Sequence, residues 1–278
     1  MFPWRRILIP TDFSTAAKWV FDDAIRMAKS TKAELLILHV RMTHRSDPSQ
    51  LRYPADTSVY DYVEQHELEL LRKHVERADP TLRTRLIVRK SSDPGGEILR
   101  TALDEQADLI VMATHARHHI AHLIVGSTTL ALLSRCTVPL LSIRYGIRKR
   151  LALKKMILAV DPARPSQMAI ALAGAIARHE GSKITIACAT GQASSPTAAE
   201  AVSTVREHLE DLDVDEVILE GSADREIVRL AASSDADLTI ISPGCGPSEE
   251  PSDTSIAIIR RAETPVLIVP EPMTTPTP

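Results

Sequence analysis

The stretch Ala113 to Thr128, with the sequence ATHARHHIAHLIVGST, is the part of the chain that decides its fold. It directly follows an apolar run, Leu109 to Met112, that is typical of a buried strand. It ends in Gly126-Ser127-Thr128, small residues that open an amphipathic segment typical of a helix. A strand, a turn and a helix N-terminus in this order make an anion site, because free backbone N–H groups and the helix dipole converge there. The stretch therefore predicts an α/β unit with a candidate site for a nucleotide phosphate.

Short apolar runs alternate with helix-like segments on both sides of this stretch. We expect strands at residues 7–9, 35–40, 86–88, 109–112 and 140–143. Continuous hydrophobicity within such runs indicates strands buried on both faces, as in a parallel sheet covered by helices. Alternating strands and helices imply βαβ units with right-handed crossovers, and hence a doubly wound parallel sheet.

Helical spacing of apolar residues marks the segments between the strands. One helix is expected to follow Ser14, which can cap it, and to run through Ala17 and Ala28. Asp93-Pro94 is a good helix start, because proline suits the first helical position. The residues expected to supply the buried face of that helix are Ile98, Leu99, Ala102 and Leu103.

The pattern then repeats. Asp161 closes an apolar run like the one before Asp12, at an offset of 149 positions (161 − 12). Glu226-Ile227 matches Glu97-Ile98 at an offset of only 129 (226 − 97), so the second copy has lost 20 residues (149 − 129) between the two blocks. A repeat of this length predicts tandem copies of one domain. We expect a first domain at 1–146, a basic solvated linker at 147–155, a second, shortened domain at 156–270 and a disordered tail at 271–278.

Composition narrows the class of protein. Hydrophobic residues make up 44% and charged residues 25%, which is typical of a globular protein. A net charge of −3 favours neither nucleic acid nor an anionic membrane as a partner. No apolar segment is long enough for a signal peptide or a spanning helix, and the three cysteines lack the spacing of a disulfide framework. These observations predict a location in the reducing cytoplasm.

At this point the residues resemble a known family. The opening ILIPTD at 7–12 is similar to the start of universal stress protein domains, and Ser92-Asp93-Pro94 with ADLIVM at 107–112 is similar to their third helix and fourth strand. Gly126-Ser127 and Thr137-Val138-Pro139 fit their last helix and strand, and the resemblance covers nearly the whole chain twice. It implies two tandem Rossmann-like, adenine nucleotide alpha hydrolase-like domains, each a five-stranded, mainly parallel sheet with helices on both faces. It also implies a pseudo-dimer of the two domains in one chain, and self-association as a homodimer.

The resemblance assigns a nucleotide site to the first copy. ATP-binding members carry Gly-x-x-Gly, nine residues, then Gly-Ser/Thr; here Ala113 and Ala116 replace the first two glycines. If both positions need left-handed dihedrals, each alanine costs roughly 1–2 kcal/mol, which would weaken binding on the order of 30- to 1,000-fold. The residues that the resemblance places around ATP or AMP with Mg²⁺ are Pro10, Thr11, Asp12, Val40, Met112, Ala113, His115, Ala116, Gly126, Ser127 and Thr128. Asp12 has a second interpretation, as a capping or turn residue.

The second copy departs further from the motif. Ser252-Asp253-Thr254 stands opposite Gly126-Ser127-Thr128, and Glu249, Glu250 and Asp253 put negative charge where phosphates would lie. We therefore expect no nucleotide in the second domain. A competing interpretation makes a metal site of the first copy's histidines, which would share one face of a helix and are His115, His118, His119 and His122. The resemblance places two of them in a loop instead, so no metal is expected.

The sequence leaves three hypotheses for function. The first is a non-catalytic stress-response or signalling module whose first domain binds ATP or AMP weakly. The second is a nucleotide-independent dimerising interaction protein that keeps the fold. The third, a slow ATP hydrolase, is disfavoured because the loop lacks the invariant lysine of a P-loop and because no nucleophile–base pattern is present.

Overall fold

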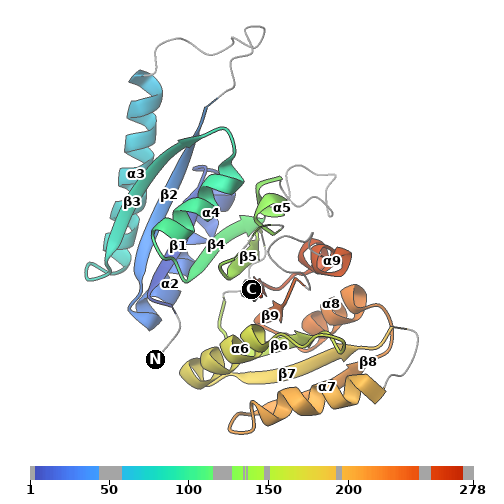
Figure 1. Ribbon diagram of the computed structural model, residues 1–278. Helices are drawn as coiled ribbons and strands as arrows, with labels where there is room; N and C mark the ends of the chain where they lie inside the picture. The colour runs from blue at the N-terminus through green and yellow to red at the C-terminus, as the bar shows by residue number, and fades with distance from the viewer. Residues whose placement is uncertain are drawn as a thin grey trace, which may run out of the picture.

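The computed structural model describes residues 4–43, 58–114, 127–133, 135, 137–146, 151–191, 196–243 and 252–271. The described part of the chain forms two α/β domains (Figure 1). The strands of the first domain are β1 (Arg6–Thr11), β2 (Glu34–Met42), β3 (Thr84–Ser91), β4 (Leu109–Thr114) and β5 (Leu140–Arg144). Its helices are α1 (Thr15–Trp19), α2 (Phe21–Thr31), α3 (Ser58–Ala78), α4 (Pro94–Asp104) and α5 (Ser127–Leu133).

The second domain repeats this alternation of strands and helices, with a single helix between its first two strands. Its strands are β6 (Lys155–Val160), β7 (Lys183–Ala189), β8 (Val214–Leu219), β9 (Leu238–Ile241) and β10 (Val266–Ile268). Its helices are α6 (Gln167–Glu180), α7 (Pro196–Glu207), α8 (Ala223–Ser233) and α9 (Asp253–Arg261). Helix α7 has 12 residues where α3 has 21, so part of the 20-residue loss removes turns of that helix.

One ten-stranded sheet runs through both domains, in the order β3-β2-β1-β4-β5-β10-β9-β6-β7-β8. Each half is parallel, and the two halves join where β5 pairs antiparallel with β10, Leu141 opposite Leu267. The fold class predicted from the alternating pattern is thereby confirmed.

Two hydrophobic layers cover the faces of this sheet. The layer on one face takes residues from α2, α3, α6 and α7, and it continues across the β5–β10 seam through Leu141, Ile143 and Leu267. The layer on the other face takes residues from α4, α5, α8 and α9. At the seam, Ser30 Oγ at the end of α2 donates to Glu180 Oε1 of α6 at 2.8 Å. The two domains therefore share their hydrophobic layers as well as one sheet.

Local sequence signals position the helices. Ser14 Oγ accepts a hydrogen bond from Ala17 N, and Asp93 caps α4 with Pro94 at its first position, as the sequence predicts. The single helix expected from Ala17 to Ala28 is instead two, α1 and α2, which meet at Val20. Leu103, predicted to be buried, is 56% exposed.

Candidate functional site

The candidate site lies at the carboxyl ends of the parallel strands of the first domain. Strand β1 pairs with β2 on one side and with β4 on the other, so the connections from this point lead to opposite sides of the sheet. Ligands of open α/β sheets bind in the crevice outside such a switch point. Thr11 ends β1, Val40 lies near the end of β2 and Met112 near the end of β4, so three of the predicted residues come from adjacent strands.

The turn after β1 is held by its own side chains. Asp12 Oδ1 accepts a hydrogen bond from Ser14 N at 3.0 Å, and Thr11 Oγ1 accepts one from Phe13 N at 3.0 Å. Phe13 has a φ of 60°, which is unfavourable for a residue with a side chain. Asp12 therefore acts as a turn residue, as its second interpretation predicts, and its side chain is exposed.

Two further residues predicted for the site, Met112 and Thr128, belong to β4 and α5. Met112 is buried in the layer that contains α4 and α5, and its sulfur lies 4.0 Å from the Thr129 hydroxyl. Thr128 stands at the start of α5, which packs on α4 at Gly95. A Cβ on Gly95 would lie 2.8 Å from Ala131 Cβ, so this close helix contact requires glycine.

Ala113 does not have the conformation that the sequence argument supposed. It belongs to β4, opposite Ile143 of β5, and it is absent from the described residues with positive φ. Its side chain is buried in the layer that contains α2 and α3. An alanine in an extended strand costs no left-handed strain, so the condition for the predicted penalty is not met at Ala113.

Several predicted residues fall outside the part of the chain that the structure describes. They are His115, Ala116, Gly126, His118, His119 and His122. Ser127 is the first residue of α5. The tail from 272, the linker residues 147–150 and the acidic residues Glu249 and Glu250 are also outside. The described residues contain no cluster of histidine, cysteine and acidic side chains that could hold a metal ion.

A charged cluster beside the site escaped the sequence analysis. Arg41 Nε donates to Glu64 Oε2 at 2.7 Å, and Arg41 Nη1 lies 2.6 Å from Asp61 Oδ1. The hydrogen bond to Glu64 raises the pKa of Arg41 above its ordinary value. His39 Nδ1 lies 2.9 Å from the Thr11 carbonyl oxygen. The one sequence signal for this cluster is that histidine and arginine interrupt the apolar run of β2 at its carboxyl end.

The second domain has a cavity at the equivalent edge. It encloses about 300 Å³ between the ends of β6 and β9 and the starts of α6 and α9. Asp161 lines it, and its Oδ1 accepts from Ala163 N at 2.9 Å, the same turn that Asp12 makes. Ser252 also lines it, but its hydroxyl already accepts from Ser255 N to cap α9. The carboxylate at the first position of α9, Asp253, faces solvent at the helix N-terminus.

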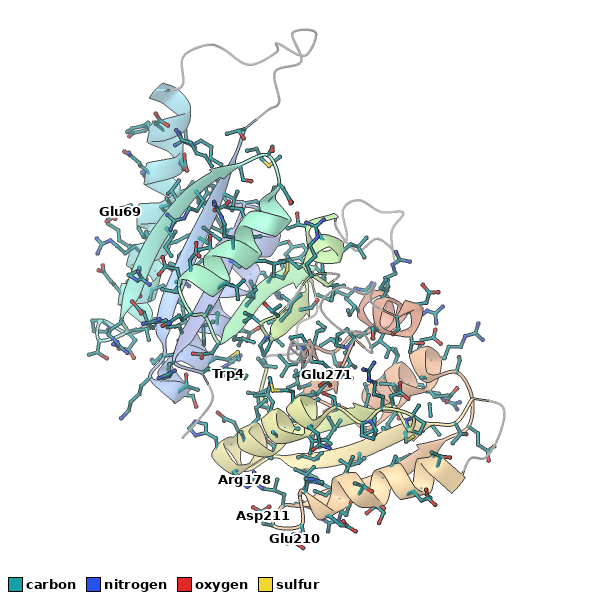
Figure 2. All side chains as sticks on the ribbon, in the orientation of Figure 1. Trp4, Glu69, Arg178, Glu210, Asp211 and Glu271 are labelled. Atoms are coloured by element: carbon teal, nitrogen blue, oxygen red, sulfur yellow. The ribbon has the colours of Figure 1, made fainter. Side chains whose placement is uncertain are left out.

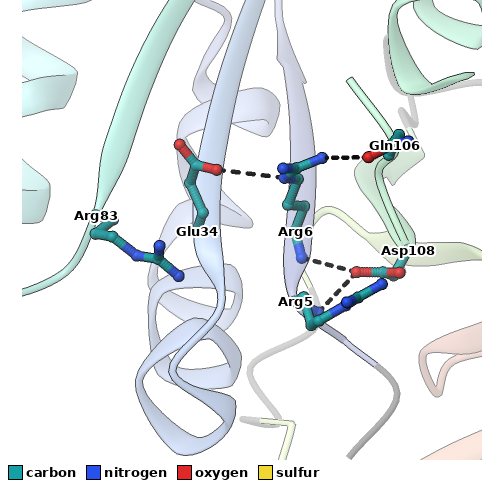
Figure 3. Close-up of a pocket in the computed structure, with 6 residues that line it drawn as sticks. All are labelled: Arg5, Arg6, Glu34, Arg83, Gln106 and Asp108. Atoms are coloured by element: carbon teal, nitrogen blue, oxygen red, sulfur yellow. Dashed lines mark hydrogen bonds and ion pairs between the residues drawn. The ribbon is translucent and has the colours of Figure 1, made fainter. Parts of the chain in front are cut away.

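Another hollow, of about 190 Å³, lies at the opposite, amino-terminal edge of the first domain. Figure 3 shows its lining: Arg6 is paired with Glu34 and Gln106, while Asp108 holds the start of β1. Asp108 Oδ2 accepts from the backbone N–H groups of Arg5 and Arg6. Its carboxylates are thus engaged by the protein itself, and we assign this hollow a structural role.

Ion pairs at the outer end of the second domain are also structural. Arg178 at the end of α6 makes two hydrogen bonds of 2.7 Å to Asp211, which follows α7 (Figure 2). These bonds lower the pKa of Asp211 below its ordinary value. Within the described ranges, none of the helices has the length and hydrophobicity of a membrane-spanning segment.

Comparison with known proteins gives a consistent result. A model of the Universal stress protein family matches residues 3–144 and again residues 152–270. A universal stress protein of Methanocaldococcus jannaschii is 27% identical over 158 residues, which cover 51% of this chain and 95% of that protein.

Solved structures share the two-domain arrangement. A universal stress protein from Archaeoglobus fulgidus aligns with a TM-score of 0.73 at 16% identity, over 96% of this chain and 97% of that chain. A putative universal stress protein from Pseudomonas aeruginosa aligns with a TM-score of 0.62 at 19% identity, over 96% and 93%. Likeness at these identities concerns the fold.

Proposed function

Because the chain belongs to the universal stress protein family, we propose that its first domain is a non-catalytic module that binds ATP or AMP weakly, and that its second domain binds no nucleotide. One observation carries the proposal: Thr11, Asp12 and Met112 converge at the switch point beside the start of α5. Asp12 offers a carboxylate for a base or ribose donor, and Met112 offers an apolar contact for the nucleoside. The N-terminus of α5 then offers N–H groups to phosphate.

The second domain lacks the last of these elements. Ser252 uses its hydroxyl to cap α9, and Asp253 places a carboxylate where phosphate would gain from the helix dipole. The cavity beside Asp161 is therefore a poor site for an anion. In this proposal the second domain contributes its strand β10 and its cores to the pseudo-dimer.

The experiment is a calorimetric titration of the full chain with ATP-Mg²⁺ and with AMP, using Asp12→Ala and its counterpart Asp161→Ala as a matched pair. We expect binding in the micromolar to millimolar range that Asp12→Ala abolishes and Asp161→Ala leaves unchanged. Asp161→Ala loses the same turn in the other domain and so controls for a general loss of stability. Asp12→Asn keeps the side-chain oxygen that accepts from Ser14 N but loses the charge, so loss of binding in this variant separates a ligand contact from the turn. Absence of heat at millimolar ATP would refute the proposal.

A second pair of variants separates the effects of Ala113 and Ala116. If position 116 needs a left-handed dihedral, Ala116→Gly should tighten ATP binding about tenfold, the effect of relieving roughly 1–2 kcal/mol. Ala113→Gly is expected to change affinity less than twofold, because Ala113 lies in a strand. A larger effect at Ala113 than at Ala116 would indicate that the residue that weakens ATP binding lies in β4 rather than after it.

A nucleotide-independent interaction protein is the second candidate. It is favoured by the turn that Asp12 and Asp161 share, since a residue needed for structure in both copies requires no ligand. Titration of ATP and AMP into the wild-type chain and the Asp12 variants decides between the two candidate functions. Slow ATP hydrolysis is tested in the same samples: phosphate release that persists in Asp12→Ala would come from a contaminant or from another site.

A further inference from the structure

His39 stands at the junction of β1, β2 and α3. Its side chain is only 15% exposed. Its ring stacks on the ring of Phe13, with centroids 4.3 Å apart and planes inclined at 26°. It therefore touches the turn that carries Asp12 from one side.

Both ring nitrogens of His39 face hydrogen-bond acceptors. Nδ1 lies 2.9 Å from the carbonyl oxygen of Thr11, and Nε2 lies 3.5 Å from Oε1 of Glu64. A carbonyl and an ionised carboxylate can only accept, whereas a neutral imidazole carries one N–H and one lone pair. A neutral ring would thus point a lone pair at one of the two acceptors, and only the imidazolium can donate to both.

The surroundings of Glu64 are an independent reason to expect a proton on both ring nitrogens of His39. Its side chain is 7% exposed, and among the described residues no hydrogen bond reaches its buried Oε1. Its other oxygen, Oε2, is taken by Arg41. A buried carboxylate oxygen without a donor is costly, and the N–H of a protonated His39 is positioned to supply one.

The charges that surround the ring agree with this assignment. Helix α3 presents Glu64 and Asp61, and β2 presents Arg41, which pairs with both of them. The neighbouring strand β3 places uncharged Val88 opposite His39. With a protonated His39 the cluster has two cations and two anions; with a neutral ring it has one uncompensated negative charge.

We propose that His39 is an imidazolium at neutral pH and acts as a positioning residue, which ties the turn of residues 12–14 to α3 through Thr11 and Glu64. Phe13 has a positive φ, so this turn needs contacts from outside to hold its conformation. Loss of the Nε2 proton leaves Glu64 Oε1 without its donor, and the turn then loosens from α3. The effect on a ligand beside Asp12, weaker binding as pH rises, rests on the proposed function; the proton and the turn do not.

In the second copy, a different residue occupies the position that corresponds to His39. Cys188 occupies the place of His39 and pairs in register with Val160, the counterpart of Thr11. Cys188 is fully buried, and burial raises the pKa of its thiol. The cysteine remains a neutral thiol packed in the apolar layer of that face, so His39→Cys is a substitution that the fold already accommodates in the second copy.

The experiment is NMR of the nucleotide-free full chain with ¹⁵N-labelled histidine, which reports the protonation of each ring nitrogen. At pH 7 we expect both nitrogens of His39 to be protonated. In Glu64→Gln the amide can donate to Nε2 while its oxygen still accepts from Arg41, so we expect a neutral ring at pH 7. Glu67→Gln, on the same helix in an exposed pair with Lys18, is the control and should leave His39 doubly protonated.

A second readout follows the turn itself. The amide shifts of Phe13 and Ser14 should titrate together with His39 in the wild-type chain and lose that step in His39→Cys. A neutral ring at pH 7 in the wild-type chain, or amide shifts that ignore its titration, would overturn the proposal. Because no nucleotide is present, a failure of ATP binding leaves this result intact, and a neutral His39 leaves the ATP proposal intact.

Discussion

The two domains share one topology but differ at the carboxyl end of their second strand. In the first domain, His39 bridges the end of β1 and Glu64 of the 21-residue helix α3. In the second domain, the buried thiol of Cys188 takes this position, and the corresponding helix α7 has only 12 residues. The same sheet thus supports a charged cluster in one copy and apolar packing in the other.

The largest expected effect on stability concerns the two helices beside the candidate site, α4 and α5, and their counterparts in the second domain. The first domain brings α4 against α5 through Gly95, whose counterpart in the second domain is Asp224. There Asp224 forms an ion pair with Arg261 of α9 instead. Gly95→Asp should destabilise the first domain by about 2–3 kcal/mol, because the new Cβ meets Ala131. Asp224→Gly should lower the free energy of unfolding of the second domain by only about 1 kcal/mol.

Denaturant unfolding followed by tryptophan fluorescence checks the first value, since both tryptophans, Trp4 and Trp19, lie in the first domain. Hydrogen exchange of β6 and β9 checks the second. Equal losses for the two variants would show that the helix pairs pack alike and that the exchange of glycine for an ion pair is unimportant.

A smaller and symmetric effect is expected at the other edge of the sheet. Asp108 accepts from the backbone N–H groups of Arg5 and Arg6, and Asp237 accepts from those of Lys154 and Lys155. Asp108→Ala and Asp237→Ala should each cost their own domain about 1–2 kcal/mol, since each removes two charge-assisted hydrogen bonds. Hydrogen exchange of β1 and β6 measures both, and a loss confined to one domain would break the equivalence.

The smallest effect concerns a buried acid that the second copy replaces with Leu172. Burial raises the pKa of Asp23, against the opposing charge of Arg26. A carboxyl whose pKa is higher in the folded state binds its proton more tightly there, so its contribution to stability increases as pH falls through the raised pKa. Asp23→Asn should remove this increase and stabilise the first domain slightly at pH 7. Melting temperatures across pH 4–7 test it, with the exposed neighbour Asp22→Asn as control; identical slopes for wild type and Asp23→Asn would contradict the assignment.

Much of the architecture could be predicted from single residues in the sequence. The apolar runs are long enough to be strands and continuous enough to be covered on both faces, so Leu35 to Leu38 are all fully buried as expected. Asp93 and Pro94 start α4 because capping and a fixed φ are local properties. The prediction that Leu103 is buried was wrong for a non-local reason, because its helix turns that position toward solvent beyond the edge of the core.

The candidate site was predictable in part. Its strand ends follow from the positions of Thr11, Asp12 and Met112, whereas Glu64 lies on a charged helix where nothing in the sequence singles out one carboxylate. Ala113 was misjudged because motif spacing alone does not show where a strand ends. Its hydrogen-bonded register with Ile143 continues through the position where the motif suggested a turn.

The sequence by itself determined the α/β class, the repeat and the loss of 20 residues between the copies, because hydrophobic periodicity and offsets are properties of the chain read in order. Tertiary structure decided which charges meet. His39, Arg41 and Glu64 are brought together only when β2 lies between β1 and β3 and α3 covers that face. Hydrogen bonds depend on distances between side chains far apart in sequence, and no pattern along the chain encodes those distances.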